Sequence, residues 1–101
     1  MTDATLSGIP PRVRDIIREV AEEHGFAPED LIGPLSRKAL CWARYDAWAR
    51  IRERIVIAGR PPSFHQIGLW FGGRDFTTIK NGLRRIAGAT DSALARLLEA
   101  A

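Results

Sequence analysis

Polar and basic side chains gather near residues 74–86, and their types suit contacts with nucleic acid. Ile79, Gly82, Leu83 and Ile86 have the i, i+3, i+4, i+7 spacing of a helix with one buried face. Threonine can offer a methyl group to thymine or a hydroxyl to a base or phosphate, and asparagine can pair with adenine. Burying the apolar stripe leaves outward Phe76, Thr77, Lys80, Asn81, Arg84 and, at the far end, Arg85, and Thr78 offers the same groups as Thr77.

A preceding short helix is expected to position this surface. Ser63 followed by Gln66 has the spacing of a capping box, and Gly72-Gly73 would end the helix that begins there. Asp75 can cap the next helix or accept a hydrogen bond from cytosine. Helix, glycine-containing turn and helix together predict a helix-turn-helix over about residues 63–86, with its second helix in the major groove. The expected core side of the first helix is Phe64, Ile67, Gly68 and Phe71.

The charge distribution supports a phosphate-binding half. The formal net charge of the 101 residues is only +3. Residues 1–33 carry 3 basic and 7 acidic side chains, whereas residues 34–86 carry 11 basic and 3 acidic ones. Positive charge collected in one half of a small domain is typical of nucleic-acid binding, although a solvated basic helix face gives the same pattern.

The rest of the chain predicts further helices and no strand. Residues 1–8 are expected to be a flexible N-terminus, and residues 9–101 a single all-α domain. A helix is expected from Pro10-Pro11 to Gly25, followed by one short turn of helix over residues 28–32. The longest helix is expected over residues 37–58, with Ser36 as its N-cap, and a last helix over about residues 91–99, with Leu94, Leu97 and Leu98 inward.

One segment carries a specific resemblance. The run Gly-Gly-Arg-Asp-Phe-Thr-Thr-Ile at 72–79 resembles the signature of the C-terminal DNA-binding domain of the bacterial replication initiator DnaA, which usually reads Gly-Gly-Arg-Asp-His-Thr-Thr-Val. The match extends over residues 63–71, over Ser36-Arg37-Lys38 and Ala43-Arg44, and back to about residue 16. The resemblance implies a compact multi-helix, Trp-repressor-like domain that binds double-stranded DNA.

The resemblance also implies roles for particular residues. Those matching Asp75, Thr77 and Thr78 work in the major groove or at its rim. Arg44 and Arg85 match basic residues that hold phosphate. A loop arginine enters the minor groove in the family, and Arg37 is the nearest candidate here, with Lys38 second. The full set of expected DNA contacts is Arg37, Lys38, Arg44, Tyr45, Ser63, Arg74, Asp75, Phe76, Thr77, Thr78, Lys80, Asn81 and Arg85.

Three departures from the family pattern affect this set. Phe76 replaces a histidine, which removes a polar group but keeps a face that can pack on thymine methyl groups. Tyr45 replaces the glutamine of an Arg-Gln pair. The spacing from the Ser-Arg-Lys loop to Arg44 is one residue shorter than in the family, and the connector around residues 60–62 is longer.

Other classes of function find little support in the sequence. His24 and His65 lie far apart, neither has a carboxylate or cysteine at ligand or triad spacing, and no metal-binding pattern occurs, so we expect no enzyme, metal or cofactor. The single cysteine, Cys41, suits a reducing compartment. No apolar run approaches the length of a membrane helix, and we expect a cytoplasmic protein at the nucleoid.

The favoured function is transcription regulation, as in prophage or gene-transfer-agent regulators, because the chain lacks the Gly-Lys-Ser/Thr phosphate loop of an ATPase. Candidate partners besides DNA are a second regulatory protein and RNA polymerase. Replication control at DnaA-type sites is one alternative. A protein-interaction adaptor is another, because the chain has three tryptophans and Trp42 or Trp70 could be exposed.

Overall fold

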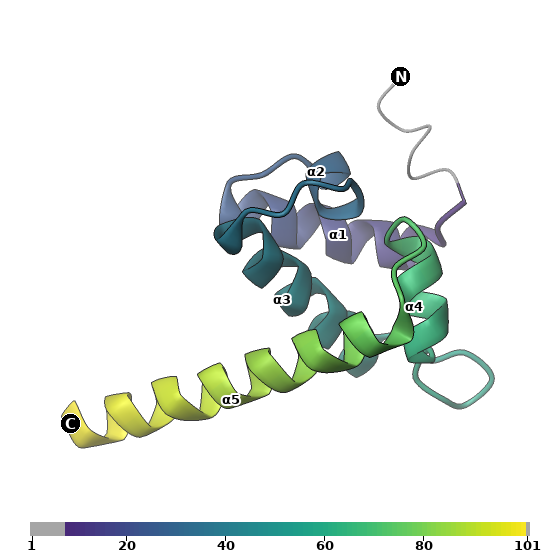
Figure 1. The fold of residues 1–101 in the computed structure, drawn as a ribbon. Helices are drawn as coiled ribbons and strands as arrows, with labels where there is room; N and C mark the ends of the chain where they lie inside the picture. The colour runs from purple at the N-terminus through teal and green to yellow at the C-terminus, as the bar shows by residue number, and fades with distance from the viewer. Residues whose placement is uncertain (1–7, 101) are drawn as a thin grey trace.

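The predicted all-α fold is confirmed by a computed structural model, which describes the backbone of residues 8–100 and the side chains of residues 8–88. Residues 1–7, most of the predicted N-terminal tail, lie outside the described part. Within it the only β-type pairing is an isolated bridge between Ile57 and Arg60. The helices, drawn in Figure 1, are α1 (Pro11–His24), α2 (Pro28–Ile32), α3 (Lys38–Arg54), α4 (Phe64–Trp70) and α5 (Phe76–Ala100).

The first two helices follow the sequence prediction. Pro11 occupies the first turn of α1, where its missing N–H costs no hydrogen bond, and Gly25 ends the helix in the left-handed conformation with φ of 78°. α2 is a single short helix that Gly33 closes by donating to the Glu29 carbonyl. The predicted apolar stripe of α1 is buried: Val13, Ile16, Ile17 and Val20.

α3 is shorter than predicted at both ends. Arg37, not Ser36, is the N-cap, and the helix ends at Arg54, four residues before the expected end. The reason is a β-branched run, Ile55-Val56-Ile57, which favours extended backbone. Ala58 and Gly59 then take positive φ values of 52° and 80°, and Ile57 and Arg60 exchange backbone hydrogen bonds of 2.7 and 3.1 Å across a tight turn.

α4 begins and ends where expected, whereas α5 corrects the prediction of two separate helices. It runs without interruption from Phe76 to Ala100, because the sequence after Ile86 contains no proline and only Gly88 as a weak helix breaker. Figure 1 shows α5 as the longest helix, crossing α3 near its own N-terminal end. The expectation that Leu94, Leu97 and Leu98 point inward falls outside the described side chains.

The core forms around α3, which contacts α1, α2 and α5. Trp48 and Phe71 are its largest fully buried side chains, and their rings meet edge to face with centroids 5.7 Å apart. Trp70, one of the two tryptophans that could have been exposed for partner binding, is also buried. Trp42 is half-buried beside Tyr45. The predicted stripe of α3 is buried throughout: Leu40, Ala43, Ala47, Trp48, Ile51 and, just after the helix, Ile55.

An ion-pair network joins α3 to α1. Arg50 donates hydrogen bonds to Glu19 at 2.6 Å, to Glu23 at 2.7 and 2.9 Å, and to Asp46 at 2.8 and 3.0 Å. Arg54 adds a second bond to Glu19 at 2.9 Å. The pKa of Arg50 is raised, first by its hydrogen bonds to Glu23, and the pKa values of Glu19 and Glu23 are lowered, first by their hydrogen bonds to Arg50. Three carboxylates therefore surround one guanidinium on this face.

Candidate nucleic-acid interface

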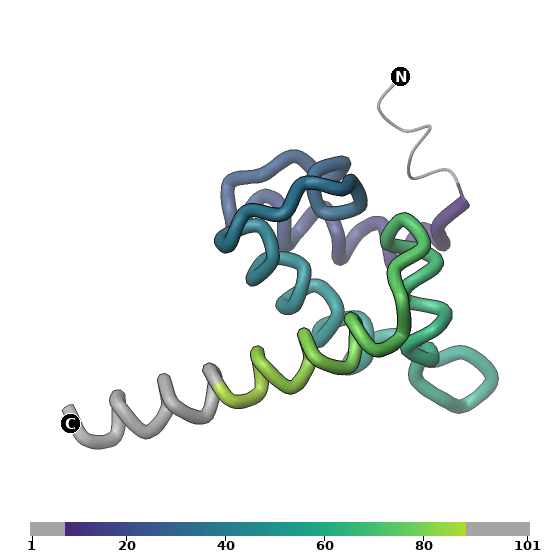
Figure 2. The backbone as a smooth tube through the Cα atoms, in the orientation of Figure 1, coloured from purple at the N-terminus to yellow at the C-terminus, as the bar shows by residue number. Residues whose placement is uncertain are grey.

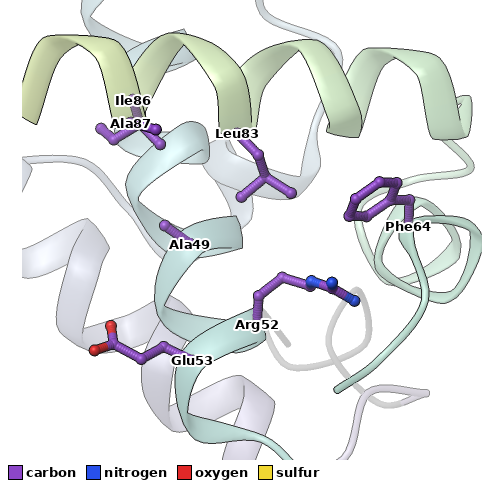
Figure 3. Close-up of a pocket in the computed structure, with 7 residues that line it drawn as sticks. All are labelled: Ala49, Arg52, Glu53, Phe64, Leu83, Ile86 and Ala87. Carbon is purple, nitrogen blue, oxygen red and sulfur yellow. The ribbon is translucent and has the colours of Figure 1, made fainter. Parts of the chain in front are cut away.

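α4 is anchored at its N-terminus by a cap and by α3. The Ser63 hydroxyl accepts from the Gln66 amide at 3.0 Å, as the capping pattern predicts. Arg52 of α3 donates to the Pro62 carbonyl at 2.7 Å, and its guanidinium lies over the Phe64 ring, 4.8 Å from the centroid. Figure 3 shows this contact at one end of an open groove lined by Ala49, Arg52, Glu53, Phe64, Leu83, Ile86 and Ala87.

The turn between α4 and α5 closes on one carbonyl. The Gly68 carbonyl accepts from the amides of Phe71, Gly73 and Arg74 at 3.2, 2.9 and 2.9 Å. A Cβ at Gly68 would collide with the Arg74 carbonyl oxygen, so only glycine permits the turn to lie this close to α4. In Figure 2 the tube reverses at the end of α4 and runs back along it to α5. The predicted helix-turn-helix geometry is thus present.

The first turns of α5 present polar and basic side chains outward, in the arrangement that the apolar stripe predicted. Ile79 and Gly82 are buried, and Leu83 packs against the core. Phe76, which replaces the family histidine, is 53% exposed. The remaining side chains on this surface are also exposed: Asp75, Thr77, Thr78, Lys80, Asn81, Arg84 and Arg85.

The basic loop before α3 is exposed as well. Ser36, Arg37 and Lys38 all have exposed side chains, and Arg37 stands at the N-cap of α3. Tyr45, one turn of helix beyond Cys41, is half-buried, and its ring contacts those of Trp42 and Trp48 at centroid distances of 5.3 and 5.6 Å. Tyr45 therefore serves the packing of α3, and a DNA contact through it remains a prediction.

Arg44, one of the expected phosphate contacts, is buried in the structure. Its side chain is only 3% exposed, and the burial lowers its pKa. Its Nε donates to the Leu31 carbonyl at 2.8 Å, and its Nη2 donates to the Asp30 and Gly33 carbonyls at 2.9 Å each. The Asp30 and Leu31 carbonyls belong to the last turn of α2 and the Gly33 carbonyl follows it, where carbonyls lack helical donors. The guanidinium that was expected at the DNA is therefore used inside the protein.

Arg74, from the signature segment, is held in a similar way. Its Nη1 donates to the Ile32 and Phe71 carbonyls at 3.2 and 2.5 Å, and its Nη2 donates to the Gly33 carbonyl at 2.7 Å. Burial, and after it the positive charge of Arg44, lowers the pKa of Arg74. Sequence reasoning could not find this role, because two of the three acceptors, the Ile32 and Gly33 carbonyls, are backbone atoms some forty residues away that have no side-chain signature.

The described residues offer no other evident centre for chemistry. They contain no group of three or more histidine, cysteine or acidic side chains that could hold a metal ion. His24 Nε2 donates to the Asp46 carboxylate at 2.9 Å at the edge of the α1–α3 ion pairs. Among the described residues, no helix is both long and apolar enough to cross a membrane.

The fold and this surface are those of a helix-turn-helix domain. Comparison with known proteins shows which of them this chain resembles. The chain is 38% identical over 85 residues to the chromosomal replication initiator protein DnaA of Cereibacter sphaeroides, covering 82% of this chain and 18% of that protein. The same initiator from Thermus thermophilus is 35% identical over 78 residues, covering 77% and 17%. That of Caulobacter vibrioides is 34% identical over 90 residues, covering 86% and 17%.

The chain thus spans less than a fifth of the length of these relatives. The resemblance to the C-terminal domain of DnaA is confirmed, and it covers most of the present sequence. No protein-family model matches the chain, and no solved structure matches it significantly.

Proposed function

We propose that this protein binds double-stranded DNA in a sequence-specific manner and regulates transcription from the sites that it occupies. The observation that carries the proposal is the exposed surface of the turn and the first turns of α5, in a chain that resembles the DNA-binding domain of DnaA. In a helix-turn-helix, residues at the start of the second helix meet base edges in the major groove.

The proposal assigns different tasks to the exposed residues. Thr77, Thr78 and Asn81 contact base edges, and Phe76 packs on thymine methyl groups. Ser63, at the N-terminus of α4, lies where helix amides favour phosphate, although Ser63 already accepts from Gln66. Arg37, with Lys38 beside it, enters the minor groove. Phosphate contacts come from Lys80, Arg84 and Arg85.

Transcription regulation is the finer part of the proposal, with replication control at DnaA-type sites as the alternative. These 101 residues contain a surface for occupying DNA but no Gly-Lys-Ser/Thr loop for nucleotide phosphates. By themselves they can occupy a site, and a second regulatory protein or RNA polymerase would convert occupancy into a change in transcription.

Genome-wide mapping of bound sites tests both levels. Peaks at promoters support transcription regulation, peaks confined to an origin support replication control, and an absence of a shared sequence motif contradicts specific binding.

A duplex that carries the motif then allows a direct test. Thr77→Ala should weaken binding to it by about 1–3 kcal/mol, with little change on random DNA. Glu22→Ala, on the exposed side of α1, is the control.

A further inference from the structure

One backbone oxygen links the two parts of the proposed DNA surface. The Gly33 carbonyl accepts from Nη2 of Arg44 at 2.9 Å and from Nη2 of Arg74 at 2.7 Å. Arg44 belongs to α3, which follows the basic loop, and Arg74 belongs to the turn that precedes α5. Two guanidinium groups from separate elements therefore meet at the residue from which the loop at 34–37 departs.

The bonds around this oxygen fix the end of α2 from both sides. Arg44 also donates to the carbonyls of Asp30 and Leu31, and Arg74 also donates to the carbonyl of Ile32. Successive carbonyls at the C-terminal end of a helix carry partial negative charge, which the two cations offset. The planar guanidinium can span two acceptors at fixed angles, which a lysine ammonium cannot reproduce.

Close packing leaves little freedom at this joint. A Cβ built on Gly72 would lie 2.7 Å from the Ile32 carbonyl oxygen, and the φ of Gly72 is +76°. The turn of the helix-turn-helix therefore lies directly against the end of α2, with no side chain between them. A shift of Gly33, from which the loop departs, relative to the turn before α5 would have to break the arginine bonds.

We propose that Arg44 and Arg74 are positioning residues that hold the Arg37–Lys38 loop in register with α5, so that the minor-groove and major-groove contacts reach one DNA site together. This inference rests on the proposed DNA binding. It assigns the two arginines no contact with DNA, and it makes the contribution of Arg37 depend on Arg74.

A double-mutant cycle on the motif duplex tests this dependence. Arg37→Ala in the otherwise unchanged protein should weaken specific binding about tenfold or more, whereas in the Arg74→Lys protein it should weaken it by less than about threefold. Arg74→Lys alone should lower specific affinity about tenfold but leave random-DNA affinity and the salt slope unchanged, since it keeps the charge. Additive losses in the cycle would overturn the proposal.

Direct phosphate contact is the rival role, and removal of the charge distinguishes it. If Arg74→Gln lowers the salt slope on random DNA by about one, Arg74 touches phosphate and the proposal is wrong. If Arg37→Ala has no effect in the unchanged protein, the loop does not bind DNA and the proposal also fails. Thr77→Ala distinguishes failure of the positioning proposal from failure of the proposed DNA binding. If only the positioning proposal is wrong, Thr77→Ala still loses specificity.

Hydrogen exchange in the DNA-free protein gives a readout that does not depend on DNA. Arg74→Lys and, separately, Arg44→Lys should speed exchange of the Gly33 and Cys41 amides, which donate to the Glu29 and Arg37 carbonyls on either side of the loop, by about tenfold, with the amides of α1 unchanged. Equal acceleration in α1 would show general destabilisation and would overturn the specific positioning role. If one variant fails to fold, the other still decides the result.

Discussion

Two arginine-rich regions of the molecule, the α1–α3 face and the α4–α5 face, use positive charge in opposite ways. On the first, Arg50 and Arg54 are bonded to Glu19, Glu23 and Asp46. On the second, the basic side chains in the described part of α5, Lys80, Arg84 and Arg85, are exposed. A third group, Arg44 and Arg74, is bonded to backbone carbonyls between the two.

The difference shows that net charge along a sequence does not measure charge at a surface. Residues 34–86 hold 11 basic side chains, but several of them are used inside the fold. Arg44, Arg50, Arg52, Arg54 and Arg74 each bond to another part of the protein. Arg54 is exposed as well as bonded to Glu19, and the other exposed basic side chains of this segment are Arg37, Lys38, Arg60, Lys80, Arg84 and Arg85.

The largest expected effect would break the α4–α5 face by separating its helices. Gly68→Ala places a methyl group against the Arg74 carbonyl and should lower the free energy of unfolding by about 3 kcal/mol. The matched control is Gly88→Ala, in α5, where a Cβ would meet nothing within 4 Å and helix propensity should raise stability by up to about 1 kcal/mol. Urea denaturation measures both, and equal signs for the two variants would contradict the packing.

A smaller effect should separate exposed from bonded cations. Lys80→Gln should lower the slope of log affinity against log salt by about 0.9 and weaken binding to every sequence, because it removes one of the proposed phosphate contacts. Arg54→Gln removes the same charge from the α1–α3 face and should leave the slope unchanged. Fluorescence anisotropy on random duplex at several salt concentrations measures both; similar slopes for the two variants would remove the distinction between the faces.

The ion-paired face should matter for stability and not for DNA binding. Arg50→Gln removes the bonds to three carboxylates, and we expect a loss of about 1 kcal/mol or less, because two of the partners, Glu19 and Glu23, are exposed to solvent. Thermal unfolding measures the loss, and affinity for the motif duplex should not change. A clear drop in affinity at equal folded fraction would contradict this expectation, because it would show that the packing of α1 on α3 affects DNA binding by α5.

The smallest expected effect is the response of the same face to acid. Arg50 lowers the pKa of Glu19 and Glu23, so their contribution to stability is present above the ordinary glutamate pKa of roughly 4.3. It is lost as pH falls below that value, through the lowered pKa of the folded state. The melting temperature should therefore decrease as the pH is lowered below about 4.3, and it should decrease less steeply in Arg50→Gln. Parallel curves for the two proteins would contradict this assignment.

Periodicity predicted the helices well and their ends less well. The stripe from Leu40 to Ile55 is buried as predicted, but spacing alone did not reveal that the chain becomes extended at Ile55. The β-branched run from Ile55 to Ile57 carried that signal. In α5 the opposite error arose, because two helices were predicted where one continues from Phe76 to Ala100.

Some features of the candidate site could be predicted from the sequence and others could not. Exposure of Thr77, Thr78 and Asn81 could be predicted, because it follows from which residues of one helix are apolar. The burial of Arg44 could not, because it depends on carbonyls of α2 that sequence spacing does not bring to it. Family resemblance supplied the position of Arg44 but not its surroundings.

The hairpin after α3 has a consequence for how the chain can change in length. Ile57 and Arg60 close it through their own backbone bonds, and Val56 at its edge is 63% exposed. Arg52 holds Pro62 independently of the residues between them. Insertions at Ala58-Gly59 would therefore cost mainly loop entropy, about 0.6 kcal/mol for each doubling of length, and would leave α4 in place. This turn is thus the natural position for a dye or a tether that must not disturb the DNA-facing surface.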